Sequence, residues 1–523
     1  MRKFFLFICV TLLLFASNQV SAREIDEKID EIFAPISDTV SNFVFYPISI
    51  NGVEVPIIII WLLVGAIIFT IVTKGIGIWG FKHAIDIITG KHKSKVKEEE
   101  NDEGEVSSFQ ALATALSGTV GLGNIAGVAV AITLGGPGAV FWMIIGSIFG
   151  MASKFMEATL GVKYRKLNED HSVSGGPMYY ISHGLTKMKL RWLGQPLAIM
   201  FAWMCIVSAF GGGNMFQITM ATSQITEITG GENSFFYNNS WVCGLLIAIL
   251  IGFIIIGGIK SIVRVTEKVV PFMCILYIVA GLIVIFYHYT EIPSVIMTIF
   301  NEAFNPVAVK GGVIGCIIWG LRRSVQSNEA GVGSAPIAYA AVKTKEPVSQ
   351  GFVSLLEPFI DTVVLCSITA FVIIITGTHI NNDGLIGVEL TSRAFESVIP
   401  FSQYILALAI ILFAISTMIS WAYYGQKAWN YVFGEGIRRT RTFQLIFCAV
   451  IVIGSSMNTM SIIDFTDAMM FAMAVPNMIG MYILAPKVLE ELKKYCCKYN
   501  IGIFKNTVSE VIEEALSPEP ESD

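Results

Sequence analysis

A run of glycines and small polar residues gives the chain a place to hold a small polar solute. It reads Ser-Gly-Thr-Val-Gly-Leu-Gly-Asn-Ile-Ala-Gly from Ser117 to Gly127, inside an apolar stretch at 109–134. Each glycine weakens a helix by roughly 1 kcal/mol relative to alanine, so this density predicts a helix break. The amides and carbonyls left unpaired at such a break must face protein or a polar cavity rather than lipid. The run therefore predicts a binding site near mid-membrane.

The composition explains why a membrane must surround this run. Of 523 residues, 54% are hydrophobic and 14% are charged, and the net charge is −5. Together with a mean hydropathy of +0.67, these values exclude a soluble single-core enzyme and a disordered chain, and they argue against nucleic acid as a partner. They predict an all-α polytopic membrane protein.

About eleven apolar stretches approach the roughly 20 residues that a membrane-spanning helix needs. They lie near 56–73, 109–134, 139–160, 197–222, 241–257, 267–288, 311–326, 350–376, 402–420, 443–456 and 465–485. The loops that this pattern places inside hold 28 Lys and Arg residues, and the outer loops hold 2. The asymmetry predicts the N-terminus outside and the C-terminus in the cytoplasm.

The first 22 residues have the order of a secretory signal. Arg2 and Lys3 precede the apolar run 4–16, and Val20-Ser21-Ala22 ends in small residues. An uncleaved helix is the alternative. We expect 23–55 to be an extracytoplasmic extension, 56–485 the membrane-spanning domain and 486–523 a cytoplasmic tail.

The other reactive side chains suggest no redox or metal chemistry. Six of the nine cysteines fall in or beside apolar spans, and the six histidines show no metal-ligand spacing. Cys496-Cys497 could carry palmitate or could be plain cysteines. We expect no cofactor and no enzymatic activity.

Close packing between helices is an alternative explanation for glycines that are four residues apart. Gly123 with Gly127, and Gly146 with Gly150, are small-xxx-small pairs. We expect packing for the second pair, whereas Thr119 and Asn124 favour a site in the first run.

The order of the spans predicts an inverted repeat. If the helix at 56–73 stands apart, repeat one covers about 109–288 and repeat two about 311–485, with five spans each and opposite orientations. The second repeat opens with another glycine-interrupted segment, 311–320. Matching broken helices in the two halves indicate a secondary transporter that binds its substrate at the repeat interface.

Several long motifs resemble the alanine or glycine:cation symporter family, also called sodium:alanine symporters. The main motifs are 109–127, 135–143 and Ser-Asn-Glu-Ala-Gly-Val-Gly-Ser-Ala-Pro at 327–336, supported by 213–217, 359–362 and 421–425. The resemblance covers about 56–485. It implies the five-plus-five fold of the bacterial leucine transporter and sodium-driven uptake of a small amino acid.

A broken helix offers both polarities that an amino-acid zwitterion needs. Free amides around Gly123 and Asn124 would attract the carboxylate. Carbonyls ending the inner half-helix, and those near Gly315, could receive the ammonium. The resemblance implies Asn124, Gln217 and Trp421 as substrate contacts. With the break, the expected substrate-binding residues are Gly121, Gly123, Asn124, Gln217 and Trp421. The alternatives are an interhelical hydrogen bond for Gln217 and an interfacial position for Trp421.

Sodium prefers oxygen ligands, and the resemblance implies where they are. Carbonyls of Thr119 and Leu122 and the hydroxyls of Ser416 and Thr417 would form the metal site. The hydroxyls could instead bond back to their own helix. Leu122, where a threonine is common in the family, the triplet 211–213 and Gln326 depart from the family pattern and leave cargo and stoichiometry open.

Charged residues near helix ends have two readings. Glu357 and Asp361 share a helical face, and Arg322 and Arg323 flank another span. They could form a cytoplasmic gate, or they could be local pairs and snorkelling side chains.

The sequence thus favours a sodium-coupled symporter for alanine or glycine in the cell inner membrane, with no obligate protein partner. The alternatives are a proton-coupled symporter and a channel, although no filter-like motif is present. An intramembrane enzyme is disfavoured because no HExxH or GxSxG motif occurs.

Overall fold

The computed structural model describes most of the chain between residues 35 and 504. The described residues are 35, 37–50, 53–91, 104–169, 172–305, 311–380, 384–385, 387–457 and 460–504. The predicted signal peptide, 1–22, lies outside them. The expected extracytoplasmic extension contributes a hairpin in which β1 (Pro47–Ile50) pairs antiparallel with β2 (Val53–Pro56). A second short hairpin joins β3 (Lys166–Leu167) to β4 (Val173–Ser174).

Each of the eleven expected apolar stretches coincides with a helix or a helical segment. In chain order these are α3 (Ile57–Val72), α6 with η2 and α7 (Ser108–Thr119, Leu122–Asn124, Ala126–Gly135), α8 (Ala139–Lys163), α10 with η3 and α11 (Arg191–Phe210, Gly211–Met215, Phe216–Ile228), α13 (Ser240–Ile256), α14 (Ile259–Tyr287), α16 (Gly312–Asn328), α18 with α19, η6 and α20 (Pro347–Ser354, Leu356–Pro358, Phe359–Cys366, Ser367–Ile375), α22 (Ser402–Phe433), α23 (Ile437–Gly454) and α24 (Met460–Tyr499). Within the described residues, six helices are long and apolar enough to span a membrane, or seven with the bent α6–α7 pair. The chain is therefore a multi-pass helical protein, and the count of eleven stays a prediction.

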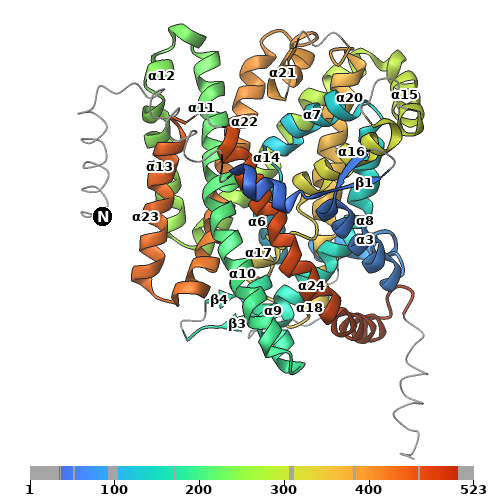
Figure 1. Cartoon of the computed structure of the whole chain (residues 1–523), viewed down its shortest axis with the longest axis vertical. Coiled ribbons are helices and arrows are strands. Elements are labelled where there is room, and N and C mark those ends of the chain that lie inside the picture. The colour runs from blue at the N-terminus through green and yellow to red at the C-terminus, as the bar shows by residue number, and fades with distance from the viewer. Residues whose placement is uncertain are drawn as a thin grey trace, which may run out of the picture.

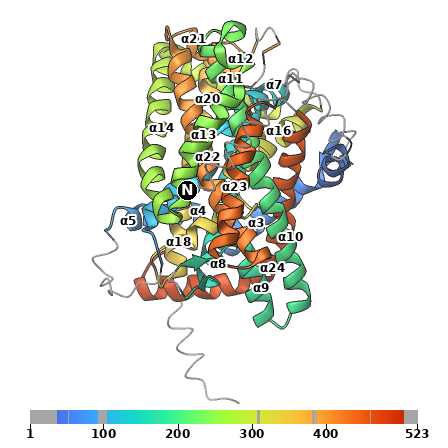
Figure 2. The same cartoon turned by 90° about the vertical axis from the view of Figure 1, so that its left-hand side faces the viewer.

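Short elements connect these helices. They are α4 (Ile76–Trp79), α5 (Phe81–Ile88), α9 (Pro177–Lys187), η4 (Gly231–Asn233), α12 (Phe235–Asn238), η5 (Tyr289–Glu291), α15 (Ile292–Phe304), α17 (Pro336–Tyr339) and α21 (Val388–Glu396). The last helix, α24, continues through Pro486 to Tyr499, into the expected tail, and its final turns lie across the lower end of the molecule (Figure 2).

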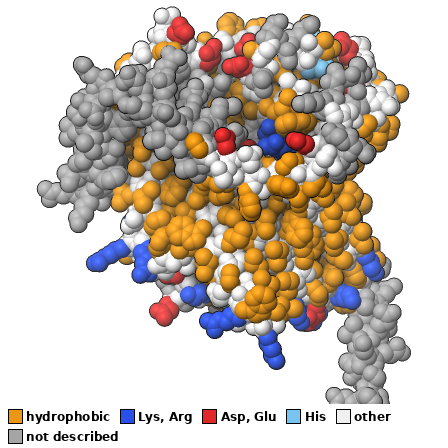
Figure 3. Space-filling model, viewed as in Figure 1, with side chains coloured by type: hydrophobic (Ala, Val, Ile, Leu, Met, Phe, Trp, Pro, Cys, Tyr) orange, Lys and Arg blue, Asp and Glu red, His pale blue; other side chains and the backbone are white. Residues whose placement is uncertain are grey.

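The long helices run roughly along one axis (Figure 1), and the kind of side chain on the surface changes along that axis. Hydrophobic side chains form a broad band around the middle, whereas Lys and Arg gather below it, at the end where α9, α18 and the hairpin β3–β4 lie (Figure 3). This is the surface that a protein surrounded by hydrocarbon at mid-height requires.

The predicted break in the first glycine run is confirmed. The helix α6 begins with a capping box, in which Ser107 Oγ accepts from the Gln110 amide and Gln110 Oε1 accepts from the Ser107 amide. It ends at Thr119, and the chain resumes with η2 and α7 after a bend of 62°.

The second break lies elsewhere than expected. Gly315 lies inside the continuous helix α16, whose interior carbonyls accept from amides of the following turn. The break expected near Gly315 is therefore wrong, and the helix frees no carbonyl there for an ammonium group. The helix instead ends at Asn328, because Glu329, Gly331 and Gly333 all adopt positive φ before α17 begins. Left-handed residues cannot continue a right-handed helix.

Two further irregularities widen helices beside the breaks. The triplet Gly211–Gly213, which departs from the family pattern, opens the π-helical segment η3. Residues Phe359–Cys366 form a second such segment, η6. By contrast, Gly146 and Gly150 serve close packing as expected, since an added Cβ would lie 2.9 Å from Leu321 and from Ala330, respectively.

Candidate substrate and ion site

The first break packs against the middle of α22. Ser117 Oγ donates to the Ser416 carbonyl at 2.7 Å, and Ser420 Oγ donates to the Thr114 carbonyl at 2.9 Å. These bonds hold the last turns of α6 on α22, and the expected ion ligands Thr119 and Thr417 lie on these two helices.

Thr417 presents its hydroxyl to the break. A Cβ added to Gly121 would lie 2.9 Å from Thr417 Oγ1, so glycine is required at this position for the approach. Although Thr417 is 3% exposed, its Oγ1 has no hydrogen-bond partner among the described residues. A buried hydroxyl without a partner costs free energy, which a bound ligand can offset.

The hydroxyl of the neighbouring Ser416, in contrast, has a hydrogen-bond partner. Ser416 Oγ donates to the Phe413 carbonyl at 2.9 Å and lies 3.5 Å from the Met273 sulfur. The alternative reading, a hydroxyl bonded back to its own helix, therefore describes Ser416 but not Thr417.

The carbonyls of Thr119 and Leu122 at the break also differ in whether they already accept a hydrogen bond. Thr119 is the last residue of α6, so no following turn of that helix supplies a donor for its carbonyl. The Leu122 carbonyl already accepts from the Ile125 amide at 3.2 Å, although a carbonyl oxygen has a second lone pair.

The other predicted side chains, Gln217 and Trp421, each lie next to a glycine of η3. A Cβ on Gly213 would lie 2.4 Å from Trp421 Cβ, and Trp421 is 3% exposed, which argues against an interfacial position. Gln217 Nε2 donates to the Gly212 carbonyl at 3.1 Å, within the same helical segment, rather than to another helix. Gln217 Oε1 is buried and finds no donor in the part of the chain that the structure describes.

Asn124 is fully engaged by protein groups. Its Nδ2 donates to Asp361 Oδ1 at 2.7 Å and to Ser327 Oγ at 3.1 Å, while its Oδ1 accepts from the Gly121 amide at 2.8 Å. Gly123 lies beside the same helix end, because its Cβ would be 3.7 Å from the Ser327 Cα. Asn124 therefore ties the first break to the end of α16 and to η6.

Asp361 also belongs to this site, although the sequence suggested for it a cytoplasmic gate or a local pair. It is fully buried and accepts hydrogen bonds from Asn124, from Ser327 and, at 2.9 Å, from Thr362. A carboxylate in an apolar span was the available signal, since such residues mark functional sites.

The suggested cytoplasmic gate is not built as proposed from the sequence. Glu357 pairs with Lys154 at 2.9 Å, with both side chains 0% exposed. Arg322 lies over the Phe45 ring, and Arg323 donates to Gln326 Oε1. Glu357 and the arginines thus belong to separate local clusters, as the second reading expected.

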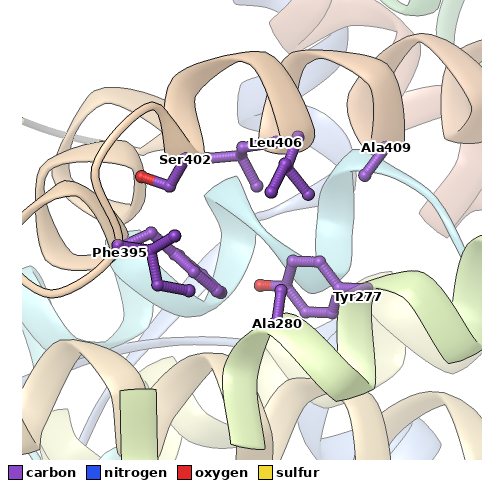
Figure 4. Close-up of a pocket in the computed structure, with 8 residues that line it drawn as sticks. Tyr277, Ala280, Phe395, Ser402, Leu406 and Ala409 are labelled. Atoms are coloured by element: carbon purple, nitrogen blue, oxygen red, sulfur yellow. The ribbon is translucent and has the colours of Figure 1, made fainter. Parts of the chain in front are cut away.

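An apolar pocket lies between α14, α21 and α22 (Figure 4). Its lining is Tyr277, Ala280, Phe395, Ile399, Ser402, Ile405, Leu406 and Ala409. The Tyr277 hydroxyl lies 2.7 Å from Thr369 Oγ1, which donates to the Asn124 carbonyl at 2.8 Å. Hydrogen bonds therefore connect this pocket to the first break.

Comparisons with known proteins agree with this architecture. The model of the sodium:alanine symporter family matches residues 38–509. The sodium/alanine symporter AgcS of Methanococcus maripaludis is 38% identical over 468 residues, which cover 88% of this chain and 97% of that protein. The amino-acid carrier protein AlsT of Bacillus subtilis is 36% identical over 412 residues, covering 77% of this chain and 84% of AlsT.

A solved structure supports the fold independently. The crystal structure of MhsT in complex with L-phenylalanine matches with a TM-score of 0.53 at 14% identity, covering 75% of this chain and 93% of that one. The predicted fold class, resembling the bacterial leucine transporter, is thereby confirmed.

Proposed function

Because this chain belongs to the sodium:alanine symporter family, we propose that it carries a small neutral amino acid, alanine or glycine, into the cell together with sodium. The observation that supports this most is the meeting of the first break with Thr417, whose buried Oγ1 lacks a partner within the described residues. A buried oxygen without a hydrogen-bond partner is a suitable ligand for a hard cation.

The sodium site uses carbonyls and hydroxyls at this meeting point. The carbonyl at the end of α6, from Thr119, and the second lone pair of the Leu122 carbonyl supply two ligands. Thr417 Oγ1 supplies a third. Ser416 contributes a remaining lone pair of its hydroxyl, because as donor that group uses only its hydrogen. None of these ligands is charged, so the ion can leave again.

The amino acid binds across the break. The amide of Gly123, ahead of α7, receives the carboxylate, since a helix N-terminus favours an anion. The amide of Gly121 already donates to Asn124 Oδ1, so Gly121 contributes through its lack of a side chain beside Thr417. Gln217 Oε1 accepts from the ammonium, and Trp421 closes over the small side chain. Asn124 positions the site and does not contact the substrate with its side chain, because that side chain is already bonded to the Gly121 amide and to Asp361.

The sodium gradient is sufficient to drive this uptake. One sodium ion crossing 100 mV contributes about 2.3 kcal/mol, and a tenfold gradient adds about 1.4 kcal/mol. Together they sustain roughly 500-fold accumulation of a neutral substrate. No cofactor beyond the coupling ion is needed. We place the protein in the cell inner membrane, with its N-terminus outside and its C-terminus in the cytoplasm.

Reconstitution into proteoliposomes tests the proposal. We expect saturable uptake of radiolabelled alanine and glycine that collapses when choline replaces sodium. Uptake driven equally well by a proton gradient without sodium would establish the proton-coupled alternative, and non-saturating flux would indicate a channel.

Substitution of Gln217 tests the substrate site separately. Gln217→Leu removes an acceptor for a charged group, worth about 1.5–3 kcal/mol, so KM for alanine should rise roughly ten- to hundredfold. The concentration of sodium that gives half-maximal uptake at saturating alanine should change much less. An unchanged KM for alanine would contradict the assignment of Gln217.

A further inference from the structure

A second buried charged cluster lies next to the break at the end of α16, apart from the ion site. It consists of Lys154 and Glu157 on α8, Glu329 in the break and Glu357 on α19. Glu329 is 4% exposed and the other three side chains are 0% exposed. The proposed transport mechanism uses none of them.

The charges of this cluster do not balance. Glu357 has the partners of an ionised carboxylate, since Lys154 Nζ lies 2.9 Å from Oε1 and the Tyr339 hydroxyl donates to Oε2 at 2.6 Å. Glu157 and Glu329 are also within electrostatic range of the same Lys154 ammonium. Three carboxylates thus share one ammonium. Full ionisation would leave two uncompensated charges buried, which is strongly unfavourable.

Glu157 is the carboxyl group whose contacts are incomplete. Its Oε1 accepts a hydrogen bond from Asn477 Nδ2 at 2.8 Å. Its Oε2 is buried without a hydrogen bond of normal geometry among the residues described, although the Gly331 backbone amide lies near the carboxyl group. A bare anionic oxygen at this depth requires a cation or a proton.

The arrangement favours a proton over a multivalent metal ion, and the ammonium of Lys154 beside Glu157 disfavours any further metal cation. Within the described ranges, no group of three or more His, Cys, Asp or Glu side chains converges closely enough to hold a metal. A proton needs one oxygen only, and Glu157 Oε2 provides it.

Asn477 connects this carboxyl group to the second break. Asn477 Nδ2 also donates to the Gly331 carbonyl, at 2.9 Å, in the second break. Asn477 Oδ1 accepts from the Tyr180 hydroxyl, which fixes the orientation of the amide. An ionised Glu157 holds Asn477 more strongly than a neutral one, because hydrogen bonds to charged acceptors are stronger.

We propose that Glu157 is a proton-binding site linked to the second break through Asn477. The proton is bound in the packed arrangement seen here, and it is released when the segment around Gly331 moves and Glu157 gains a polar environment. The binding of a proton is independent of the identity of the cargo, whereas its role in uptake depends on the proposed function.

Several ionisable groups face Glu157 from the surrounding elements. They are Lys154 on α8 itself, Tyr180 on α9, Tyr339 on α17 and Glu357 on α19, with Glu329 interacting through Lys154. Any pH dependence must therefore be assigned with matched variants.

Infrared difference spectroscopy on the purified full chain tests proton binding directly. At neutral pH the wild type should show a carbonyl stretching band of a protonated carboxylic acid that shifts in heavy water. Glu157→Gln should lose a component of this band, whereas the matched variant Glu329→Gln should retain that component. Absence of the band from the wild type, or its retention in Glu157→Gln, would overturn the proposal.

A second variant keeps the test valid if Glu157→Gln fails to fold. Asn477→Leu leaves the carboxyl group in place but removes its hydrogen bond, so the Glu157 component should shift in frequency. An unshifted spectrum would show that the proton lies elsewhere.

Uptake measurements then separate the two proposals. With a sodium gradient, alanine uptake by the wild type should vary with pH, and uptake by Glu157→Gln should vary much less. Equal pH dependence in both proteins would overturn the proton link to transport. Absence of alanine uptake by the wild type, with the infrared band present, would refute the proposed function and leave the proton site standing.

Discussion

Replacing Thr417 by valine should stabilise the sodium-free protein while removing most of its response to sodium. Valine has nearly the shape of threonine, and it removes a hydroxyl that is buried without a partner in the described structure. Such a hydroxyl costs about 1–3 kcal/mol, so Thr417→Val should gain a comparable amount in the absence of sodium. Ser416→Ala should have the opposite effect, because it loses the hydrogen bond to the Phe413 carbonyl, worth about 0.5–1.5 kcal/mol.

Thermal unfolding in detergent, followed by tryptophan fluorescence, measures both effects. The wild type in sodium chloride should gain about 2.7 kcal/mol over choline chloride of equal ionic strength when sodium is at 100 times its Kd. One kcal/mol shifts Tm by about 2–4 °C in domains of 150–250 residues, and by less in a longer chain. In choline, Thr417→Val should unfold above the wild type and Ser416→Ala below it.

The rise in Tm that sodium causes tests whether Thr417 is a sodium ligand. Thr417→Val should lose most of this increment, since the ion loses a ligand that valine cannot replace. The reasoning is refuted if Thr417→Val unfolds below the wild type in choline, or if it keeps the full sodium-dependent rise in Tm.

Two further substitutions test the packing that supports the site. Gly213→Ala places a Cβ 2.4 Å from Trp421 Cβ, so it should lower the free energy of unfolding by about 1–3 kcal/mol and reduce uptake. The control is Gly212→Ala, whose Cβ has no atom within 4 Å. It should have a far smaller effect in the same thermal unfolding and uptake measurements. Lys154→Met leaves Glu357 buried without its partner and should lower the free energy of unfolding by about 3–5 kcal/mol. The double variant Lys154→Met, Glu357→Leu should recover part of this loss in denaturant titrations, and a loss as large as in the single variant would contradict a buried pair.

The first break could be predicted because its cause is local. Four glycines close together weaken a helix wherever that helix packs, so the position of the bend followed from residues 118–127 alone. The second break was misplaced for the opposite reason. The glycines at 311–320 remain within or at the start of α16, while the helix ends where Glu329, Gly331 and Gly333 take positive φ. Glycine content alone does not distinguish these two segments.

Contacts between distant segments were beyond the sequence. Asn124 contacts Asp361 across 237 positions, and Lys154 contacts Glu357 across 203. Sequence reasoning could flag each as polar in an apolar span, but it left a gate with the arginines or a local pair open for Glu357, and it expected Asn124 to contact the substrate. The actual partners depend on how helices far apart in the sequence pack.

The sequence by itself determined the helical membrane architecture, the first break and the family, because hydropathy, glycine density and long motifs are local properties of the chain. Only the tertiary structure decided that Thr417 reaches the break while Ser416 bonds to its own helix, and that three carboxylates share one lysine. These outcomes depend on which helices come within 3–4 Å of one another, and at that range a single neighbouring donor determines whether an oxygen is satisfied or left for a ligand.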